Sequence, residues 1–197
     1  MVMLKKVIVL FLIASLPVFA ALKPGTQAPD FTLQDADDRS YTLSEMSDKI
    51  IILIFGTRDA RKEGDKWMLA IDEDYGQFKE VNCYLIADLR GLPFFVTEGM
   101  VKFGVKREKI PFTTLLDWEG KIAQKYDTKK GLPNLFVIRQ GKIVYGYSGK
   151  FSDESYGKLR NDLNLVLVAN RSEQYQKLFR LCKKILLNII AQKSTVN

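Results

Sequence analysis

A run of apolar residues from Ile50 to Phe55 is the strongest hydrophobic signal after the N-terminal segment. The residues are mostly β-branched, and Lys49 and Gly56 bound the run, which predicts a strand buried on both faces, as in a parallel sheet. A helix is predicted over about 61–78, because apolar residues recur there at spacings of three and four: Trp67, Ile71, Tyr75 and Phe78. The pattern therefore begins with a strand–helix unit.

Strands and helices continue to alternate along the rest of the chain. Ser152 is predicted to cap a helix that buries Tyr156, Leu159, Leu163 and Leu167, and a further helix is expected over about 172–192. The other predicted elements are a small hairpin at 31–33 and 41–43, strands at 82–87 and 112–116, short helices at 94–103 and 122–126, and an antiparallel hairpin at 135–138 and 143–147.

The N-terminal segment has the pattern of a secretory signal peptide. Lys5 and Lys6 precede an apolar stretch over 7–16, and Val18-Phe19-Ala20 is a small-residue cleavage site. We expect cleavage after Ala20 and a periplasmic or secreted protein. The predicted organisation is a signal peptide over 1–20, a folded domain over 21–170 and an amphipathic helical extension over 171–197.

The composition of the chain excludes several kinds of catalytic and metal-binding site. The 197 residues are 47% hydrophobic and carry a formal charge of +7, but acidic residues are scattered among the basic ones, so nucleic acid is not an expected partner. The chain has no histidine, which excludes a Ser/His/Asp triad and His-ligated metals. Cys83 and Cys182 are the only cysteines and form no C-x-x-C motif. No metal and no cofactor are expected.

Two stretches of the chain are characteristic: PGTQAPDFTLQDADDRSYTLSEM and, more specifically, FTTLLDWEGKIAQKYDTKKGLPNLFVIRQGKIVYGYSG. Both resemble the thioredoxin superfamily, in particular its peroxiredoxin (alkyl hydroperoxide reductase/thiol-specific antioxidant) and TlpA-like branch. The resemblance covers roughly 22–168 and implies an α/β thioredoxin-like fold, with a central mixed sheet flanked by helices, an N-terminal hairpin and an extra C-terminal helix. Pro133 occupies the position of the family's cis-proline, so the resemblance implies a cis Leu132–Pro133 bond.

The segment after the first buried strand departs from this family. It reads GTRDARKEGDKW, whereas a thioredoxin has a W-C-x-x-C motif there and a peroxiredoxin has a cysteine near the helix start. Both chemistries need a thiolate at that helix N-terminus. No catalytic residue is therefore predicted. Cys83 lies mid-strand and Cys182 on an apolar helix stripe, where structural roles are favoured over redox ones, and a disulfide between them stays open.

The residues that replace the motif form a candidate ligand cleft: Thr57, Arg58, Arg61, Lys62, Leu132 and Pro133. A helix N-terminus with nearby cations favours an anion or a peptide carboxylate. The alternative, which we favour for the turn itself, is a solvated surface turn in which Asp59 and Glu63 neutralise their neighbours. Asp88 and Arg90 follow the second strand and are further candidates for this edge of the sheet.

The last predicted helix has a broad apolar face that must be covered. It can dock on its own domain, pair with a second chain as a homodimer, or lie on an anionic membrane surface; intrachain docking is favoured. The leading hypothesis for the whole protein is an exported, redox-inactive binding or structural module that takes an unknown protein or peptide partner. The alternative is a divergent thiol-disulfide oxidoreductase or peroxiredoxin-like enzyme acting through Cys83 or Cys182.

Overall fold

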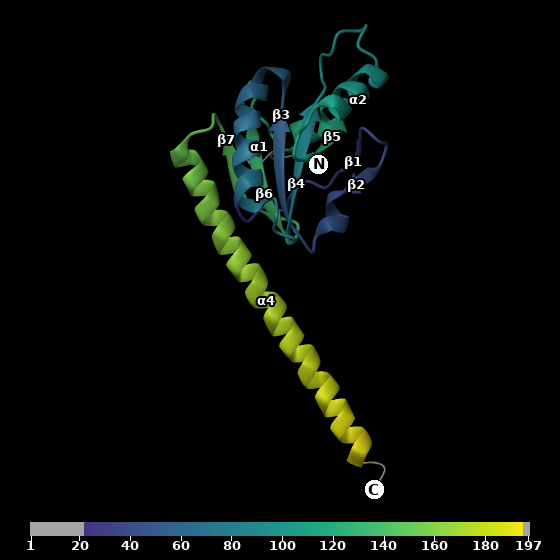
Figure 1. Ribbon diagram of the computed structural model, residues 1–197, viewed down its shortest axis with the longest axis vertical. Helices are drawn as coiled ribbons and strands as arrows, with labels where there is room; N and C mark the ends of the chain where they lie inside the picture. The colour runs from purple at the N-terminus through teal and green to yellow at the C-terminus, as the bar shows by residue number, and fades with distance from the viewer. Residues whose placement is uncertain (1–21, 195–197) are drawn as a thin grey trace, which may run out of the picture.

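The computed structural model describes residues 22–194 (Figure 1). The predicted signal peptide lies outside the described residues. The folded domain is built on one seven-stranded sheet in the order β2-β1-β5-β4-β3-β6-β7. The strands are β1 (Thr32–Asp35), β2 (Ser40–Thr42), β3 (Ile50–Gly56), β4 (Val81–Asp88), β5 (Thr113–Asp117), β6 (Asn134–Arg139) and β7 (Lys142–Ser148).

Strand β3 is the centre of the sheet, as its apolar run predicts. It pairs in parallel with β4, which pairs in parallel with β5, and it is antiparallel to β6. Residues Ile50 to Phe55 are at most 2% exposed. Successive side chains point to opposite faces of a strand, so Ile51, Leu53 and Phe55 join one core cluster while Ile50, Ile52 and Ile54 join the other. The mixed α/β sheet and the N-terminal β1–β2 hairpin are confirmed.

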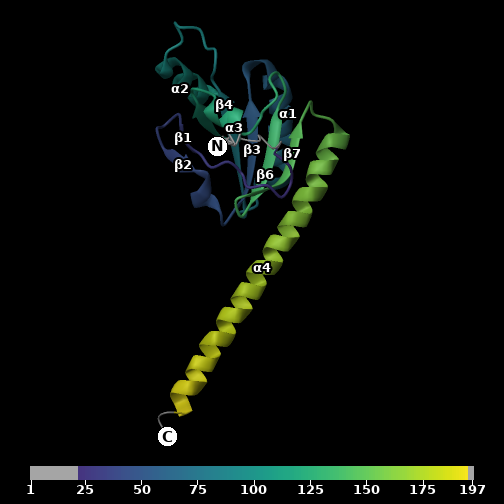
Figure 2. The ribbon, with the colours of Figure 1, turned by 180° about the vertical axis from the view of Figure 1, so that it is seen from behind.

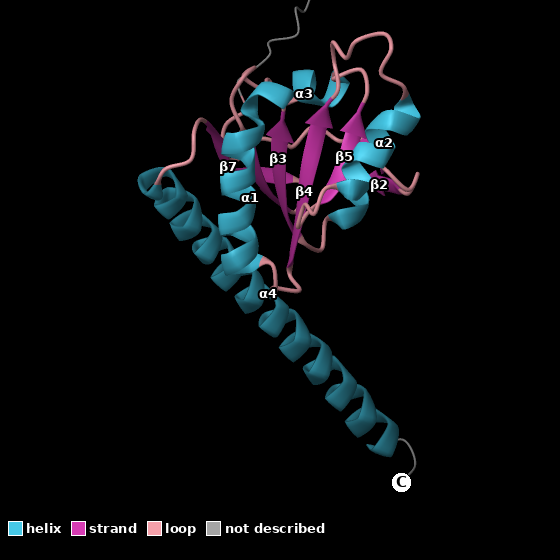
Figure 3. Ribbon diagram, turned by 45° about the horizontal axis from the view of Figure 1, so that its top comes forward, coloured by secondary structure: helices cyan, strands magenta, loops and turns pink. Residues whose placement is uncertain are grey.

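The helical elements are η1 (Leu43–Met46), η2 (Arg58–Ala60), α1 (Arg61–Tyr75), α2 (Glu98–Arg107), α3 (Lys121–Lys125) and α4 (Asp153–Ser194). Helix α1 and the first part of α4 cover one face of the sheet, and α3 lies on the other (Figure 3). The predicted helix over 94–103 is wrong at its start. Thr97 has extended backbone and its hydroxyl accepts the amide N–H of Met100 at 3.3 Å, so this cap begins α2 only at Glu98.

The two C-terminal helices that the sequence suggests are one continuous helix, α4, of 42 residues. Ser152 caps it as predicted: its hydroxyl accepts the N–H of Ser155 at 3.2 Å, and the hydroxyl of Ser155 accepts the N–H of Ser152 at 3.0 Å. No glycine or proline interrupts residues 158–194, so nothing in the sequence stops the helix near position 170.

Only the first part of α4 packs on the domain. Leu159, Leu163 and Leu167 are buried against the sheet, whereas residues 171–185 and Leu187 are all exposed. Figures 1 and 2 show, from opposite sides, that the rest of the helix extends away from the domain. The favoured expectation of intrachain docking is therefore wrong for this segment. Within the described part of the chain, no helix is long and apolar enough to cross a membrane.

Candidate functional site

The candidate cleft lies where the carboxyl end of β3 meets the loop before β6. Phe55 is paired with Asn134 in the antiparallel register, so the turn that starts at Gly56 runs beside Leu132 and Pro133. In an α/β sheet this carboxyl edge is where ligands usually bind. Figure 3 shows α1 beginning at this edge.

The turn between β3 and α1 places its predicted site residues in different environments. Thr57 is extended, and its buried hydroxyl has no hydrogen-bond partner among the described residues. Arg58 and Lys62 are exposed. Arg61 is also exposed, but its Nη1 contacts Glu108 Oε1 at 2.7 Å, on the connection from α2 to β5. The structure therefore brings Thr57 and the Leu132–Pro133 loop together but turns Arg61 towards another part of the domain.

The Leu132–Pro133 peptide bond is trans, so the cis bond that the resemblance implies is wrong. Other groups shape this loop. Gly131 has a φ of 73°, which glycine adopts without strain. The buried Asn134 amide group donates to the carbonyl oxygens of Lys129 at 3.0 Å and Leu132 at 2.8 Å, and its oxygen accepts the N–H of Lys129 at 2.8 Å. The loop thus turns at Gly131 and is held by one side chain around the ordinary proline isomer.

Removing the Asn134 side chain tests that account. Asn134→Ala leaves three backbone groups without their partner, and since each net hydrogen bond is worth about 1 kcal/mol, we expect the free energy of unfolding to fall by about 2–3 kcal/mol. Ser148 donates to the Asn134 oxygen at 2.6 Å, so Ser148→Ala is a milder control, with an expected loss of about 1 kcal/mol. Urea denaturation measures both variants. Equal losses would contradict the central role of Asn134.

The segment Gly149–Phe151 fills the space between Pro133 and α1. The N–H of Gly149 donates to the Pro133 carbonyl at 3.1 Å, and the N–H of Phe151 donates to Glu63 Oε2 at 3.1 Å. Pro133 itself is buried and Leu132 is half-buried, so Leu132 rather than Pro133 offers surface to a ligand. The hydrogen bond from Lys66 lowers the pKa of Glu63; burial opposes this, and the Phe151 N–H adds to the lowering. A carboxylate therefore occupies the first turn of α1, where the resembling families carry a thiolate.

Both cysteines are free thiols, so a disulfide between them is excluded in this structure. Cys83 is half-buried in β4, and burial, with a smaller contribution from the Asp72 carboxylate, raises its pKa from 9.0 to about 12. It borders a cavity of about 230 Å³ together with Asp72, Tyr75, Asn82 and Phe112, among others. Cys182 is exposed on the part of α4 that leaves the domain. Neither thiol lies in the candidate cleft.

Asp88 and Arg90 form a structural ion pair at the end of β4. Asp88 accepts hydrogen bonds from the Arg90 guanidinium and from the Arg90 backbone N–H. Burial would raise the pKa of Asp88, but the hydrogen bonds from Arg90 outweigh it and the pKa is lowered. A Cβ on Gly120 would lie 2.0 Å from the Arg90 side chain, so Arg90 is packed against the turn before α3 rather than presented to a ligand.

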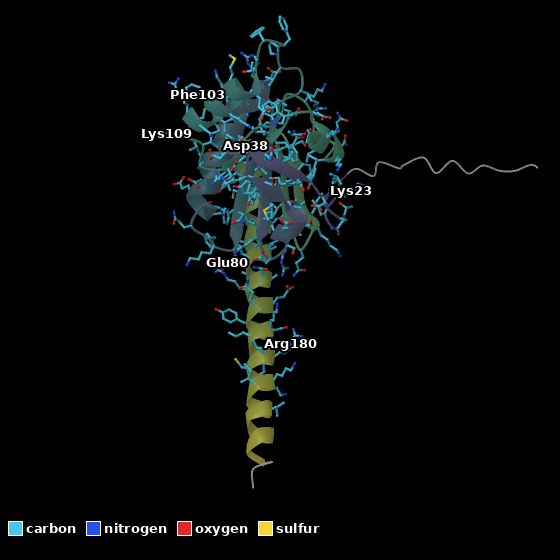
Figure 4. The ribbon with its side chains drawn as sticks, turned by 90° about the vertical axis from the view of Figure 1, so that its right-hand side faces the viewer. Lys23, Asp38, Glu80, Phe103, Lys109 and Arg180 are labelled. Carbon is cyan, nitrogen blue, oxygen red and sulfur yellow. The ribbon has the colours of Figure 1, made fainter. Side chains whose placement is uncertain are left out.

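An exposed apolar surface on the connection from β4 to α2 is the feature that sequence reasoning missed. We call it the aromatic patch; it consists of Leu92, Phe94, Phe95, Met100 and Phe103. Phe94 is fully exposed. Phe103 is 62% exposed and lies on the outer flank of the domain (Figure 4). The loop residues of the patch, Leu92, Phe94 and Phe95, follow β4, and the β3–α1 turn follows the neighbouring parallel strand, so these two segments lie at the same edge of the sheet. The sequence prediction assigned residues from Phe94 onward to a helix and did not single out this surface.

Within residues 22–194, no group of three or more acidic or cysteine side chains is placed to hold a metal ion. The edge of the sheet instead combines the exposed cations Arg58 and Lys62 with half-buried Leu132 and the aromatic patch. Mixtures of exposed charge and aromatic side chains are common at protein–protein interfaces.

Comparison with known proteins agrees with the fold. The chain is 25% identical over 146 residues to the chloroplastic peroxiredoxin Q of Sedum lineare, covering 71% of this chain and 76% of the relative. It is 26% identical to the chloroplastic peroxiredoxin Q of Oryza sativa subsp. japonica, covering 71% and 65%. Among solved structures, the thioredoxin domain of a thiol-disulfide oxidoreductase from Bacteroides vulgatus superimposes with a TM-score of 0.54 at 19% identity, over 71% of this chain and 97% of that one.

The family profile of the AhpC/TSA family matches residues 24–146, which is most of the domain and includes both the β3–α1 turn and the Pro133 loop. The match therefore extends across the segment that lacks the family's cysteine. The chain belongs to the AhpC/TSA family, on the thioredoxin-like fold.

Proposed function

We propose that this protein is a redox-inactive, exported AhpC/TSA-family member that binds an extended peptide or a protein segment at the carboxyl edge of its sheet. The observation that carries the proposal is the first turn of α1, where Arg61, Lys62, Glu63 and Gly64 stand without a sulfur atom. A helix N-terminus lowers the pKa of a thiol that lies beside it, and the first turn of α1 has no such thiol. What remains at that place is a helix N-terminus with the exposed cations Arg58 and Lys62, while the Glu63 carboxylate is bonded to Lys66 and to the Phe151 N–H. The two exposed cations favour negatively charged groups.

The ligand surface runs from Arg58 and Lys62 to Leu132, with the aromatic patch at the same edge. Exposed aromatic side chains are the residues that most often anchor protein partners. The cations suit an acidic residue or a terminal carboxylate of the bound segment. Export is proposed from the pattern of residues 1–20, and it would place binding in the periplasm or outside the cell.

The rival function is a thiol-disulfide oxidoreductase or peroxidase, which the family relatives favour. It would have to act through Cys83 or Cys182. Cys83 has a raised pKa, which keeps it protonated and poorly nucleophilic. Cys182 lies on the exposed helix, away from the edge of the sheet that the family uses. Cys83 therefore lacks the lowered pKa that the chemistry requires, and Cys182 lacks the position at the helix N-terminus.

Two assays on residues 21–197 separate these functions. The first assay measures the rates of hydrogen peroxide consumption and of insulin-disulfide reduction, each with a thiol reductant. We expect the unchanged protein and a Cys83→Ser/Cys182→Ser double variant to give the same rates. Peptides selected from a displayed library are then measured by fluorescence anisotropy. We expect Arg58→Glu/Lys62→Glu to weaken their binding about tenfold, which is about 1.4 kcal/mol.

The matched control is Lys79→Glu/Lys142→Glu, which makes the same charge change at exposed positions near the opposite edge of the sheet. It should leave peptide affinity unchanged. Cysteine-dependent turnover would overturn the redox-inactive part of the proposal. Selected peptides that bind both charge variants equally would overturn the binding surface.

A further inference from the structure

The part of α4 beyond the domain, residues 174–194, is called the distal helix. The last ionic contacts between α4 and the domain come from Arg171, whose Nε lies 3.2 Å from Glu80 Oε1, and Glu173, whose Oε2 lies 2.6 Å from Arg139 Nη2. From residue 174 to 185 every side chain is exposed. Figure 4 shows Glu80 near the exit point and Arg180 well clear of the domain. The side chains over 174–185 are therefore open to solvent, and in the first turns of this segment Gln174, Tyr175 and Leu178 border a surface hollow with Glu80 of the domain.

The distal helix has two different faces. At 100° per residue, most of the large apolar residues between 174 and 187 gather with Cys182 on about half of the cylinder: Tyr175, Leu178, Phe179, Leu181, Cys182 and Ile185. The exception is Leu187, which lies on the other half. The five large apolar side chains of this face are 51–73% exposed. Lys177, Arg180 and Lys184 lie on the opposite half. An exposed apolar face of this width costs free energy in water and needs a cover.

Charge limits what that cover can be. Residues 174–194 contain five basic residues and no acidic one. Two copies of the distal helix paired through their apolar faces would gain no opposite-charge contact, because neither copy has an acidic residue in this segment. A lipid surface with anionic headgroups has the complementary charge.

The width of the apolar face points the same way. A two-stranded coiled coil covers a narrow seam, here the line through Tyr175, Leu178, Cys182 and Ile185. Phe179 and Leu181 lie on either side of that line and would stay in water. A bilayer surface covers half a cylinder at once. Helices with an apolar half and a Lys/Arg-rich half lie in the plane of the membrane interface.

We propose that the distal helix binds the surface of an anionic lipid bilayer, with its Cys182 side in the acyl region and Lys177, Arg180 and Lys184 towards the headgroups and water. At 1.5 Å per residue its length is about 30 Å. The proposal is independent of the peptide-binding function, because the two surfaces share no residue. Bound in this way, the distal helix would attach the domain to a membrane surface without spanning the bilayer.

The test uses residues 21–197, since the apolar stretch at 7–16 could itself bind lipid and the described fold lies entirely beyond it. Binding is measured by co-sedimentation with vesicles of phosphatidylcholine alone or mixed equally with phosphatidylglycerol. We expect binding to the mixed vesicles, at least about tenfold weaker binding to phosphatidylcholine, and loss of binding at high salt. Lys177→Glu/Arg180→Glu/Lys184→Glu and Leu178→Ser/Phe179→Ser should each weaken binding about tenfold or more.

The control Lys23→Glu/Lys129→Glu/Lys130→Glu makes the same total charge change on exposed residues of the domain and should bind as the unchanged protein does. All variants should keep the thermal unfolding midpoint of the domain, because the distal helix does not pack on it. A control that loses as much binding as the distal-helix variant would overturn the assignment to this helix. So would an absence of binding to the anionic vesicles.

A local probe reports how the helix lies. An environment-sensitive fluorophore on Cys182, in a Cys83→Ser background, should brighten and shift to the blue on anionic vesicles. The same fluorophore on Gln176→Cys, in a Cys83→Ser/Cys182→Ser background, should change little, because position 176 lies outside the apolar half. The Cys182 probe could instead shift to the blue without vesicles, by an amount that grows with protein concentration. That result would show that a second copy of the chain covers the apolar face, and it would overturn the proposal.

Discussion

Replacing Trp67 with alanine is expected to lower the free energy of unfolding by about 3–5 kcal/mol, the usual cost of removing a buried large aromatic side chain. Trp67 is fully buried on α1, and its ring packs against Tyr147, Phe151 and Tyr156 at centroid distances of 5.4, 5.2 and 6.2 Å. Its Nε1–H also donates to the Gly149 carbonyl at 3.4 Å. One side chain thus joins α1, the end of β7 and the start of α4.

The matched control for this prediction is Leu69→Ala on the same helix. Leu69 is 64% exposed, so its loss should change stability by no more than about 0.5 kcal/mol. Urea unfolding followed by far-ultraviolet circular dichroism measures both variants and does not depend on tryptophan emission. Trp67→Phe should give an intermediate loss, because it keeps most of the ring contacts. A Trp67→Ala loss below about 1 kcal/mol would contradict the packing described here.

The central elements were predictable because burial on both faces leaves a strong pattern in the sequence. Ile50 to Phe55 must be apolar at every position in the middle of a parallel sheet, and Trp67, Ile71 and Tyr75 must recur at helical spacing to reach that sheet. The cap at Ser152 was predictable for a similar reason, since it depends on neighbours three residues away. Local chemistry decides these features.

Most of the wrong predictions concern residues whose state depends on distant contacts. The helix predicted over 94–103 starts instead at Glu98, because the Thr97 hydroxyl caps it there, and Phe94 is left exposed on the preceding loop. The isomer of Pro133 follows from how Asn134 ties the loop, which one sequence does not reveal. The path of the distal helix depends on where its contacts end, at Glu173. The amphipathic pattern shows that a face must be covered but not by what.

The candidate site could be predicted in position but not in composition. Spacing and resemblance place Thr57, Arg58 and Leu132 at one edge of the sheet, and the β3–β6 register confirms that the turn and the loop meet. The ion pair between Arg61 and Glu108 joins residues 47 positions apart, and no periodicity signals it. The same is true of the Gly149–Phe151 segment, which covers Pro133 through hydrogen bonds formed only after folding.

In the native protein, Cys83 is expected to react with iodoacetamide at least about a thousandfold more slowly than it does after unfolding. Its pKa is raised from 9.0 to about 12, mainly by burial, and each unit lowers the thiolate population at neutral pH tenfold. Alkylation at pH 8, followed by mass spectrometry of the two cysteine peptides, measures the rate at each site. Cys182 is exposed and should be modified quickly in the native state.

The raised pKa of Cys83 also predicts how this thiol changes the free energy of unfolding with pH. Below about pH 9 the thiol is protonated in both the folded and unfolded chains, so it has no effect on stability. Between about 9 and 12 the unfolded chain ionises first, so this group favours unfolding as pH rises. Cys83→Val should lessen the alkaline loss of stability in that window, measured against the unchanged protein by urea unfolding.

The two cysteine rates also decide between the functions. With Cys182→Ser, the native protein should show almost no alkylation until it is unfolded, because only the buried thiol remains. If Cys83 instead reacts in the native state as fast as in the unfolded chain, the thiol is accessible and ionised. The oxidoreductase alternative would then regain its nucleophile in β4. Slow native reaction of Cys83 would support the proposed binding function and would leave Cys182 as the thiol that the oxidoreductase alternative requires.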